Sequence, residues 1–136
     1  SMLVLVIATT LVLDADWGPW WGIALLSLAA VVNAMGLGAL IGTYARNAEQ
    51  ASQFAGIVAT VLAFIGGVFV PIAAGPGLFD TLTRISPHRW LLAGFGANSG
   101  TGTVVDVLIP TLVVAGMGVL LGAIAFGRRS KLTGVV

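Results

Sequence analysis

The sequence contains no cysteine, one histidine and one lysine, and charged residues make up only 8% of it. Without cysteine it offers no disulfide framework, no thiolate metal site and no thiol nucleophile. With His88 as the single histidine, one chain cannot build a two-histidine metal site, and H-E-x-x-H is absent. The net charge is +1 and the basic residues form no patch among aromatic side chains, so we exclude nucleic acid as a partner.

Long apolar runs dominate the chain instead, and 58% of its residues are hydrophobic. Three runs of about 21 to 30 residues carry no charged side chain, and each is long enough as a helix to cross a hydrocarbon core of roughly 30 Å. We therefore predict an all-α integral membrane protein, a polytopic helical bundle. The full spans are expected over residues 20–45, 51–70 and 107–127.

Residues 2–13 are equally apolar, but about 12 residues cover only roughly 18 Å as a helix. We interpret them as a truncated span that ends before Asp14 and Asp16. A secretory signal peptide is the alternative, but the segment has no basic n-region and no small-residue cleavage site. The chain opens on Ser1, which favours a piece of a longer protein, with residues 1–136 forming a single transmembrane domain.

The distribution of basic residues predicts the orientation. The connector over residues 44–52 and the tail over residues 128–136 fall on the same side of the bilayer if the three spans cross it. These two segments hold most of the basic residues, namely Arg46, Arg128, Arg129 and Lys131, against Arg84 and Arg89 on the other side. Both segments are therefore expected to be cytoplasmic in a multi-pass protein of the cell membrane. Trp17, Trp20 and Trp21 are expected to anchor the outer interface.

Small residues recur at every fourth position in the spans, a spacing that lets helix backbones approach closely. The first full span carries Ala30, Ala34, Gly38 and Gly42, the second carries Ala51, Ala55, Ala59, Ala63 and Gly67, and the last carries Gly118 and Gly122. Each ladder fits packing within the chain, or contact with a second protomer. Asn33 is polar near the middle of its span, so we predict a bond to a neighbouring helix, with substrate contact as the alternative.

Residues 76–100 are predicted to form a re-entrant pair of short outer helices. Residues 78–85 alternate apolar and polar side chains as an interfacial helix does, and Ser86-Pro87 has the chemistry of an N-cap followed by proline at the first helical position. The next apolar segment, through residue 97, is too short to span a bilayer. Thr103 and Asp106 resemble a capping box that opens the last span, in which Pro110 is a candidate kink.

The sequence carries no catalytic motif. Residues 96–100 do not match G-x-S-x-G, and Lys131 has no glycine before it, so no P-loop is present. Asp80 and Asp106 are expected at solvated helix ends rather than as a catalytic pair. An intramembrane enzyme would need a polar constellation at one depth. We therefore expect no enzymatic activity, no cofactor and no metal.

The order of features resembles the C-terminal half of ABC-2 type transporter permeases over nearly the whole chain. A short turn over residues 46–51 precedes a span that closes on a Gly-Gly-x-Phe-x-Pro sequence, followed by Ser-Pro, a tryptophan, a glycine-rich stretch, a last span and a basic tail. The most specific positions, which we term the re-entrant motif, are Gly66, Gly67, Phe69, Pro71, Pro87 and Trp90.

The resemblance implies an exporter membrane domain of six spans. Such a domain is dimeric, is driven by a separate or fused ABC ATPase, and has re-entrant outer helices between spans five and six. On that mapping the chain holds the end of span three and spans four to six, and the cytoplasmic coupling helix that contacts the ATPase lies between spans two and three, outside the chain.

The implied function is export of a drug, lipid or glycan-type substrate through the bilayer, by a homodimer or heterodimer of permease protomers. A stand-alone membrane scaffold or assembly partner without transport activity is the alternative. The second full span corresponds to the family's fifth, expected beside the dimer axis and translocation path. Its candidate residues are Ala55, Ala59, Ala63 and Gly67 on the small face, expected to pack, and Phe54, Val58 and Leu62 on the opposite face, expected to be free to meet substrate or lipid.

Overall fold

The computed structural model describes residues 2–68 and 77–134, and within them every regular element is an α-helix. The helices are α1 (Met2–Leu13), α2 (Trp20–Gly42), α3 (Ala48–Ile65), α4 (Leu78–Ile85), α5 (Pro87–Ser99) and α6 (Val104–Thr133). Among the described residues, α2, α3 and α6 are long and apolar enough to cross a membrane. The predicted all-helical, polytopic architecture is confirmed. Phe69 and Pro71 of the re-entrant motif lie outside the described residues.

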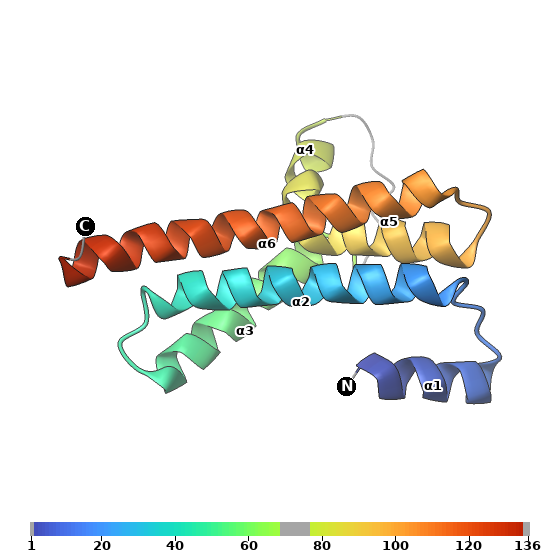
Figure 1. Ribbon diagram of the computed structural model, residues 1–136, viewed down its shortest axis with the longest axis horizontal. Helices are drawn as coiled ribbons and strands as arrows, with labels where there is room; N and C mark the ends of the chain where they lie inside the picture. Colours follow the sequence, from blue (N-terminus) through green and yellow to red (C-terminus); the bar gives the residue numbers. More distant parts are fainter. Residues whose placement is uncertain (1, 69–76, 135–136) are drawn as a thin grey trace.

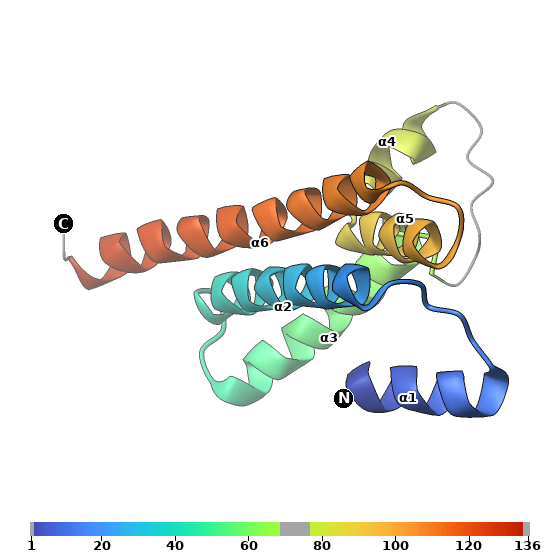
Figure 2. The same ribbon diagram turned by 45° about the vertical axis from the view of Figure 1, so that its right-hand side comes forward.

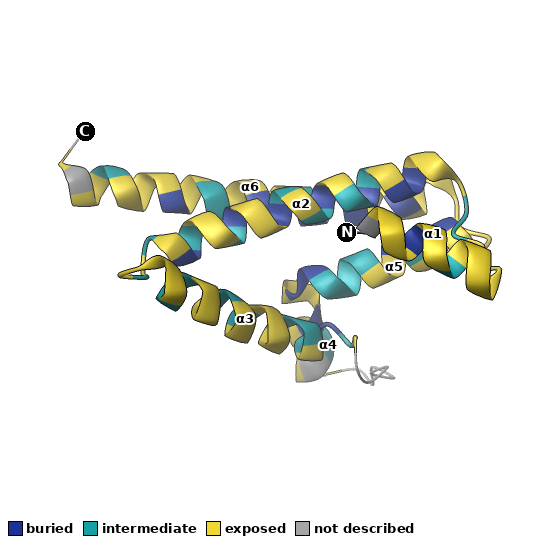
Figure 3. Cartoon of the chain, turned by 90° about the horizontal axis from the view of Figure 1, so that it is seen from below, coloured by how far each residue is buried: buried dark blue, intermediate teal, exposed yellow. Residues whose placement is uncertain are grey.

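The centre of the bundle is formed by α2 and α6, which lie side by side and run in the same direction, while α5 packs against both in the opposite direction (Figure 1). The side chains of Leu26, Val107 and Val114 are fully enclosed between these helices. Buried residues lie mainly on the facing sides of α2, α5 and α6 (Figure 3). These three helices form the packed core against which the remaining elements are placed.

Helix α3 diverges from this core. Its N-cap is Asn47, whose side chain accepts a hydrogen bond from the Gln50 N–H at 2.8 Å, and the helix ends before Gly67, which has a φ of +80° that favours glycine. No residue of α3 is buried in the described structure, and its packing against α2 and α5 is slight (Figures 2 and 3). Most of this span is therefore exposed in a single chain.

Helix α1 lies beside the first part of α2 (Figures 1 and 2), and Trp17 joins it to the core. The Trp17 indole donates a hydrogen bond from Nε1 to the Thr9 hydroxyl at 3.1 Å and meets the Phe95 ring edge-on, with ring centroids 6.4 Å apart. Trp17 is half-buried and contacts both α1 and α5, so it does not serve only as an interfacial anchor. Trp20 and Trp21 are exposed and stay candidates for the outer aromatic belt.

Helix α6 is longer than the predicted span. At its start the Asp106 carboxylate accepts hydrogen bonds from the N–H (2.8 Å) and hydroxyl (2.7 Å) of Thr103, which confirms the predicted capping box. The helix contains Pro110 and continues through the basic residues to Thr133, for 30 residues in all. Arginine and lysine favour helices, and the first breaking residue is Gly134, in the left-handed region at φ +67°. The segment predicted as a tail from residue 128 is therefore helical through Thr133.

The end of α2, the start of α3 and the end of α6 lie at the same end of the bundle (Figures 1 and 2). The Arg128 guanidinium stacks over the Tyr44 ring, 4.0 Å from its centroid, in a cation–π contact that ties α6 to the α2–α3 connector. The two segments predicted to be cytoplasmic therefore share one end of the molecule. That this end faces the cytoplasm stays a prediction.

The close contact between α2 and α6 is made by Gly36 and Gly118, neither of which belongs to the predicted first ladder. A Cβ atom at Gly36 would lie 1.9 Å from the Gly118 carbonyl oxygen, so the α2 and α6 backbones touch there. Gly38 and Gly42 of the first ladder meet no described atom within 4 Å, so the reading that this ladder packs within the chain is wrong for them. A strict four-residue step drifts about 40° around a helix of 3.6 residues per turn. The packed face instead alternates steps of four and three, through Gly22, Leu26, Ala29, Asn33 and Gly36.

Candidate functional site

An apolar cleft of about 330 Å³ opens between α3 and the α2–α6 core. Its lining comes from every element around it, namely Asn33 and Leu37 of α2, Val58 and Leu62 of α3, Ile85 and Pro87 at the α4–α5 junction, and Met117, Leu120 and Leu121 of α6. Hydrophobic walls with one amide suit an apolar or amphiphilic molecule. The cleft is the candidate functional site.

Asn33 supplies the polar group of the cleft. Its side chain is 7% exposed, and its Nδ2 donates a hydrogen bond to the Val114 carbonyl oxygen of α6 at 3.3 Å. The prediction that Asn33 bonds a neighbouring helix is confirmed. Since Asn33 also lines the cleft, its contact with a substrate is retained as a proposal.

The candidate residues of α3 differ in their positions relative to the cleft and in their exposure. Val58 and Leu62 face the cleft, whereas Ala59 and Phe54 are exposed, and Ala55, Ala63 and Gly67 are half-buried. The alanine face was predicted to pack and the Val58 face to be free, and within one chain neither face of α3 is buried. Which face of α3 meets another protomer and which meets a substrate therefore stays a prediction.

The attachment at the end of α3 explains part of the re-entrant motif. The buried Ser86 hydroxyl donates a hydrogen bond to the Leu62 carbonyl oxygen at 2.6 Å and accepts one from the His88 N–H at 3.3 Å, which confirms Ser86 as the N-cap of α5. A Cβ atom at Gly66 would lie 2.6 Å from both Ser86 Oγ and His88 Cβ. The glycine and the Ser-Pro of the motif, far apart in sequence, meet at this point. Burial lowers the pKa of His88, which favours its neutral form there.

The two predicted short helices are present as α4 and α5, and Asp80 joins them. Their position at the outer surface of the membrane stays a prediction. Its carboxylate accepts hydrogen bonds from Arg89 (2.7 Å) and Arg84 (2.9 Å), and Arg89 also donates to the Thr83 hydroxyl. The Trp90 indole donates to the Arg84 carbonyl oxygen at 2.9 Å. The hydrogen bonds from Arg89 and then Arg84 hold the pKa of Asp80 below its ordinary 3.8. Asp80 therefore stays ionised, and both pairs stay formed, at any pH above that value.

Asn98 is a structural residue that the sequence did not predict. Its side chain is 4% exposed, and its Nδ2 donates to the carbonyl oxygens of Trp17 (2.6 Å) and Pro19 (3.2 Å). Gly18, at φ +74°, and Gly22 lie so close to Asn98 that any larger residue would clash. Asn98 belongs to a glycine-rich stretch whose composition is typical of a turn, whereas in the structure α5 continues to Ser99. The amide fixes the end of α5 to the beginning of α2.

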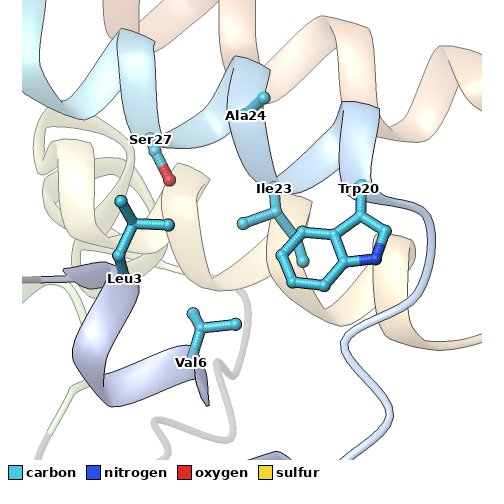
Figure 4. A pocket seen from close by; sticks show the side chains of 6 residues that line it. All are labelled: Leu3, Val6, Trp20, Ile23, Ala24 and Ser27. Atoms are coloured by element: carbon cyan, nitrogen blue, oxygen red, sulfur yellow. The ribbon is translucent and has the colours of Figure 1, made fainter.

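A second groove, of about 180 Å³, lies between α1 and α2. Its lining is Leu3, Val6, Trp20, Ile23, Ala24 and Ser27, with the Trp20 indole at one end and the Ser27 hydroxyl at the other (Figure 4). Within residues 2–68 and 77–134, no cluster of three or more potential metal-ligating side chains is found. Neither hollow offers an acid, a base and a nucleophile together.

The order of these elements can be compared with known proteins. A model of the ABC-2 type transporter family matches residues 1–99, which include α1 to α5, the α3 side of the cleft and the Ser86 attachment. The chain belongs to the ABC-2 type transporter family. Comparisons with curated proteins and with solved structures gave no match. The chain is thus a membrane permease component of an ABC transporter, as the sequence resemblance predicted. In this family the membrane component is not itself catalytic.

Proposed function

We propose that the chain is part of the permease of an ABC exporter, and that the cleft between α3 and the α2–α6 core belongs to the translocation pathway of a drug, lipid or glycan-type substrate. The cleft itself is the observation that carries the proposal, because a span without buried residues leaves an apolar hollow of about 330 Å³ beside it. Amphiphilic molecules bind in such hollows, oriented by a few polar groups.

A second permease protomer is the proposed partner of the exposed face of α3. This face carries Gln53, Gly56 and Thr60 and includes a shallow hollow that they share with Ile57 and Val61. The Thr60 hydroxyl donates a hydrogen bond to the Gly56 carbonyl oxygen at 2.8 Å, but a Gln53 amide that faces lipid is unfavourable at membrane depth, which supports a protein or water contact there. Ala59 lies exposed beside them, so the second ladder is available to a homodimeric or heterodimeric interface.

A separate or fused ABC ATPase is the proposed source of energy. The chain has no P-loop, and its family supplies the membrane component of the transporter. ATP hydrolysis would alternately widen and narrow the cleft by moving α3 relative to the core. The weak attachment of α3, through its connector and the Ser86 hydrogen bond, is compatible with such a movement.

Leu62→Trp should lower transport by roughly tenfold, because the indole fills the cleft and overpacking of that kind costs about 1–3 kcal/mol. The measurement is efflux of a panel of fluorescent amphiphilic dyes and labelled lipids by the assembled transporter in proteoliposomes. Leu28→Trp is the matched control, since Leu28 is 61% exposed on the outer side of α2 and should tolerate the indole.

If Leu62→Trp and the wild type export every transported compound at the same rate, the cleft is not part of the translocation pathway. If the assembly moves no compound and hydrolyses no ATP, a scaffold or assembly partner becomes the better description.

A further inference from the structure

The cleft between α3 and the α2–α6 core offers a narrow range of chemical groups to a ligand. Eight of the nine described residues that line it have apolar side chains, and none of these nine is charged or aromatic. Asn33 supplies the one polar side chain, and its Nδ2 already donates to the Val114 carbonyl oxygen at 3.3 Å. At most the amide oxygen and one N–H hydrogen are left for a ligand.

The charged and aromatic side chains of the neighbouring helices α4 and α5 are engaged with one another. Arg84 and Arg89 both pair with the Asp80 carboxylate. The Trp90 indole donates to the Arg84 carbonyl oxygen. An organic cation in the described part of the cleft therefore meets neither a carboxylate nor a ring face, two groups that commonly bind cations. A sugar ring brings several hydroxyl groups, and one amide cannot satisfy them all.

The depth of the cleft matches that of lipid chains. Its lining includes residues near the middle of all three candidate spans, namely Asn33 of α2, Val58 of α3 and Met117 of α6. The middle of a hydrocarbon core of roughly 30 Å lies about 15 Å from each headgroup region. A charged headgroup is unfavourable at that depth, whereas an aliphatic chain is already at home there. A lipid chain can thus enter the cleft without leaving an apolar environment.

The volume of the cleft limits how much of a lipid it can hold. About 330 Å³ is at the lower end of the roughly 300–1,000 Å³ of drug-sized pockets. A methylene group takes about as much room as a water molecule, whose share of the liquid is about 30 Å³, so the cleft holds roughly ten carbon atoms. Met117 has an unbranched side chain that adapts to the shape of such a chain. The space suits one aliphatic chain rather than two.

Resting on the proposed role of the cleft in translocation, we propose that it holds a single aliphatic chain of a lipid substrate while the headgroup stays outside. Val58 and Leu62 of α3 lie on one side of the chain, and Met117 of α6 lies on the other. Lipids are therefore the substrate class that this cleft selects among drugs, lipids and glycans. Chain length sets its selectivity, and headgroup charge does not.

Photolabelling of the assembled transporter in proteoliposomes tests the proposal. The probes are lysophosphatidylcholines of increasing chain length that carry a diazirine at the chain terminus. Mass spectrometry compares labelling at Met117 with labelling at Leu28, which is 61% exposed on the outer side of α2, so the ratio corrects for the amount of probe in the bilayer. In the wild type the ratio should be highest for chains of roughly ten carbon atoms. It should fall several-fold when the diazirine is on the headgroup.

Two substitutions change the volume of the cleft in opposite directions. Val58→Ala removes two methyl groups from its wall, so the preferred chain should become longer by roughly two carbon atoms. Leu62→Trp fills the cleft and should lower labelling at Met117 by roughly tenfold for every chain. Val31→Ala is the matched control, since Val31 is 53% exposed on α2 and is not among the residues that line the cleft. It should leave the preferred length unchanged.

The outcomes separate this proposal from the translocation role on which it rests. Labelling at Met117 that does not depend on chain length, or that does not respond to Val58→Ala, would overturn the assignment of an aliphatic chain. So would stronger labelling at Met117 by an aromatic cation such as an azido-rhodamine. The translocation role fails by a different result, namely unchanged efflux in Leu62→Trp, whichever probe labels Met117.

Discussion

Replacing Gly36 or Gly118 with leucine should abolish the folded core, the largest effect expected for any single change in this chain. A Cβ atom at Gly36 would lie 1.9 Å from the Gly118 carbonyl oxygen, and one at Gly118 would lie 2.5 Å from the Asn33 Cα. Backbone atoms cannot rotate away as side chains do, so α2 and α6 must separate and the Asn33 hydrogen bond must break. The loss should exceed the roughly 1–3 kcal/mol of ordinary overpacking.

Thermal unfolding in detergent, followed by size-exclusion chromatography, measures the effect. Gly38→Leu and Gly116→Leu are the matched controls, because each lies two residues from its counterpart on the same helix and meets no described atom within 4 Å. They should unfold close to the wild-type temperature. Gly36→Leu and Gly38→Leu unfolding at the same temperature would show that α2 and α6 do not pack in this register.

The second large effect concerns the attachment of α3. Gly66→Ala should reduce transport by roughly tenfold while the α2–α6 core stays folded, because even one methyl group costs about 1–3 kcal/mol in a filled site. That methyl group would lie 2.6 Å from Ser86 Oγ and His88 Cβ, and neither atom is the far end of a long side chain. The hydrogen bond from Ser86 to the Leu62 carbonyl oxygen would lengthen, and α3 would change its angle to the cleft.

Efflux and thermal unfolding of the assembled transporter distinguish this effect from general destabilisation. Gly96→Ala makes the same change on α5, where a Cβ atom meets nothing within 4 Å among the described atoms, and should keep transport. Ser86→Ala should act in the direction of Gly66→Ala, with a cost of about 1 kcal/mol for the lost hydrogen bond. Transport by Gly66→Ala at the Gly96→Ala level would refute the role of this attachment.

The parts of the fold that the sequence predicted depend on local chemistry. The length of each run without charged side chains predicts a membrane span, and these runs form the helices α2, α3 and α6. Ser86 before a proline, and Thr103 three residues before Asp106, specify helix starts through bonds to neighbouring backbone groups. Asn33 could be predicted to find a partner on another helix, because a polar side chain at that depth has few other options.

The remaining features depend on contacts between segments far apart in the chain. Gly36 and Gly118 are 82 positions apart, and nothing in the sequence pairs them, although Gly118 and Gly122 form the ladder predicted for the last span and both lie against α2. The first ladder was misleading for Gly38 and Gly42, since repeated small residues do not reveal which face meets a partner. Leu62 lines the cleft and the Ser86 hydroxyl bonds its carbonyl oxygen, a group that every residue has, so the sequence marks neither contact. Asn98 was missed for the same reason, as its partners are two backbone carbonyls in the α1–α2 connector.

Chemical labelling of a single cysteine at position 62 tests most directly whether the cleft belongs to a transport pathway. The chain has no cysteine, so Leu62→Cys and the control Met35→Cys each introduce one reporter, and Met35 is 69% exposed on the outer surface of α2. In the assembled transporter, a water-soluble maleimide should label position 62 at a rate that changes when ATP is added, while position 35 should stay unlabelled in lipid. Position 62 unlabelled with and without ATP, as at position 35, would contradict the account.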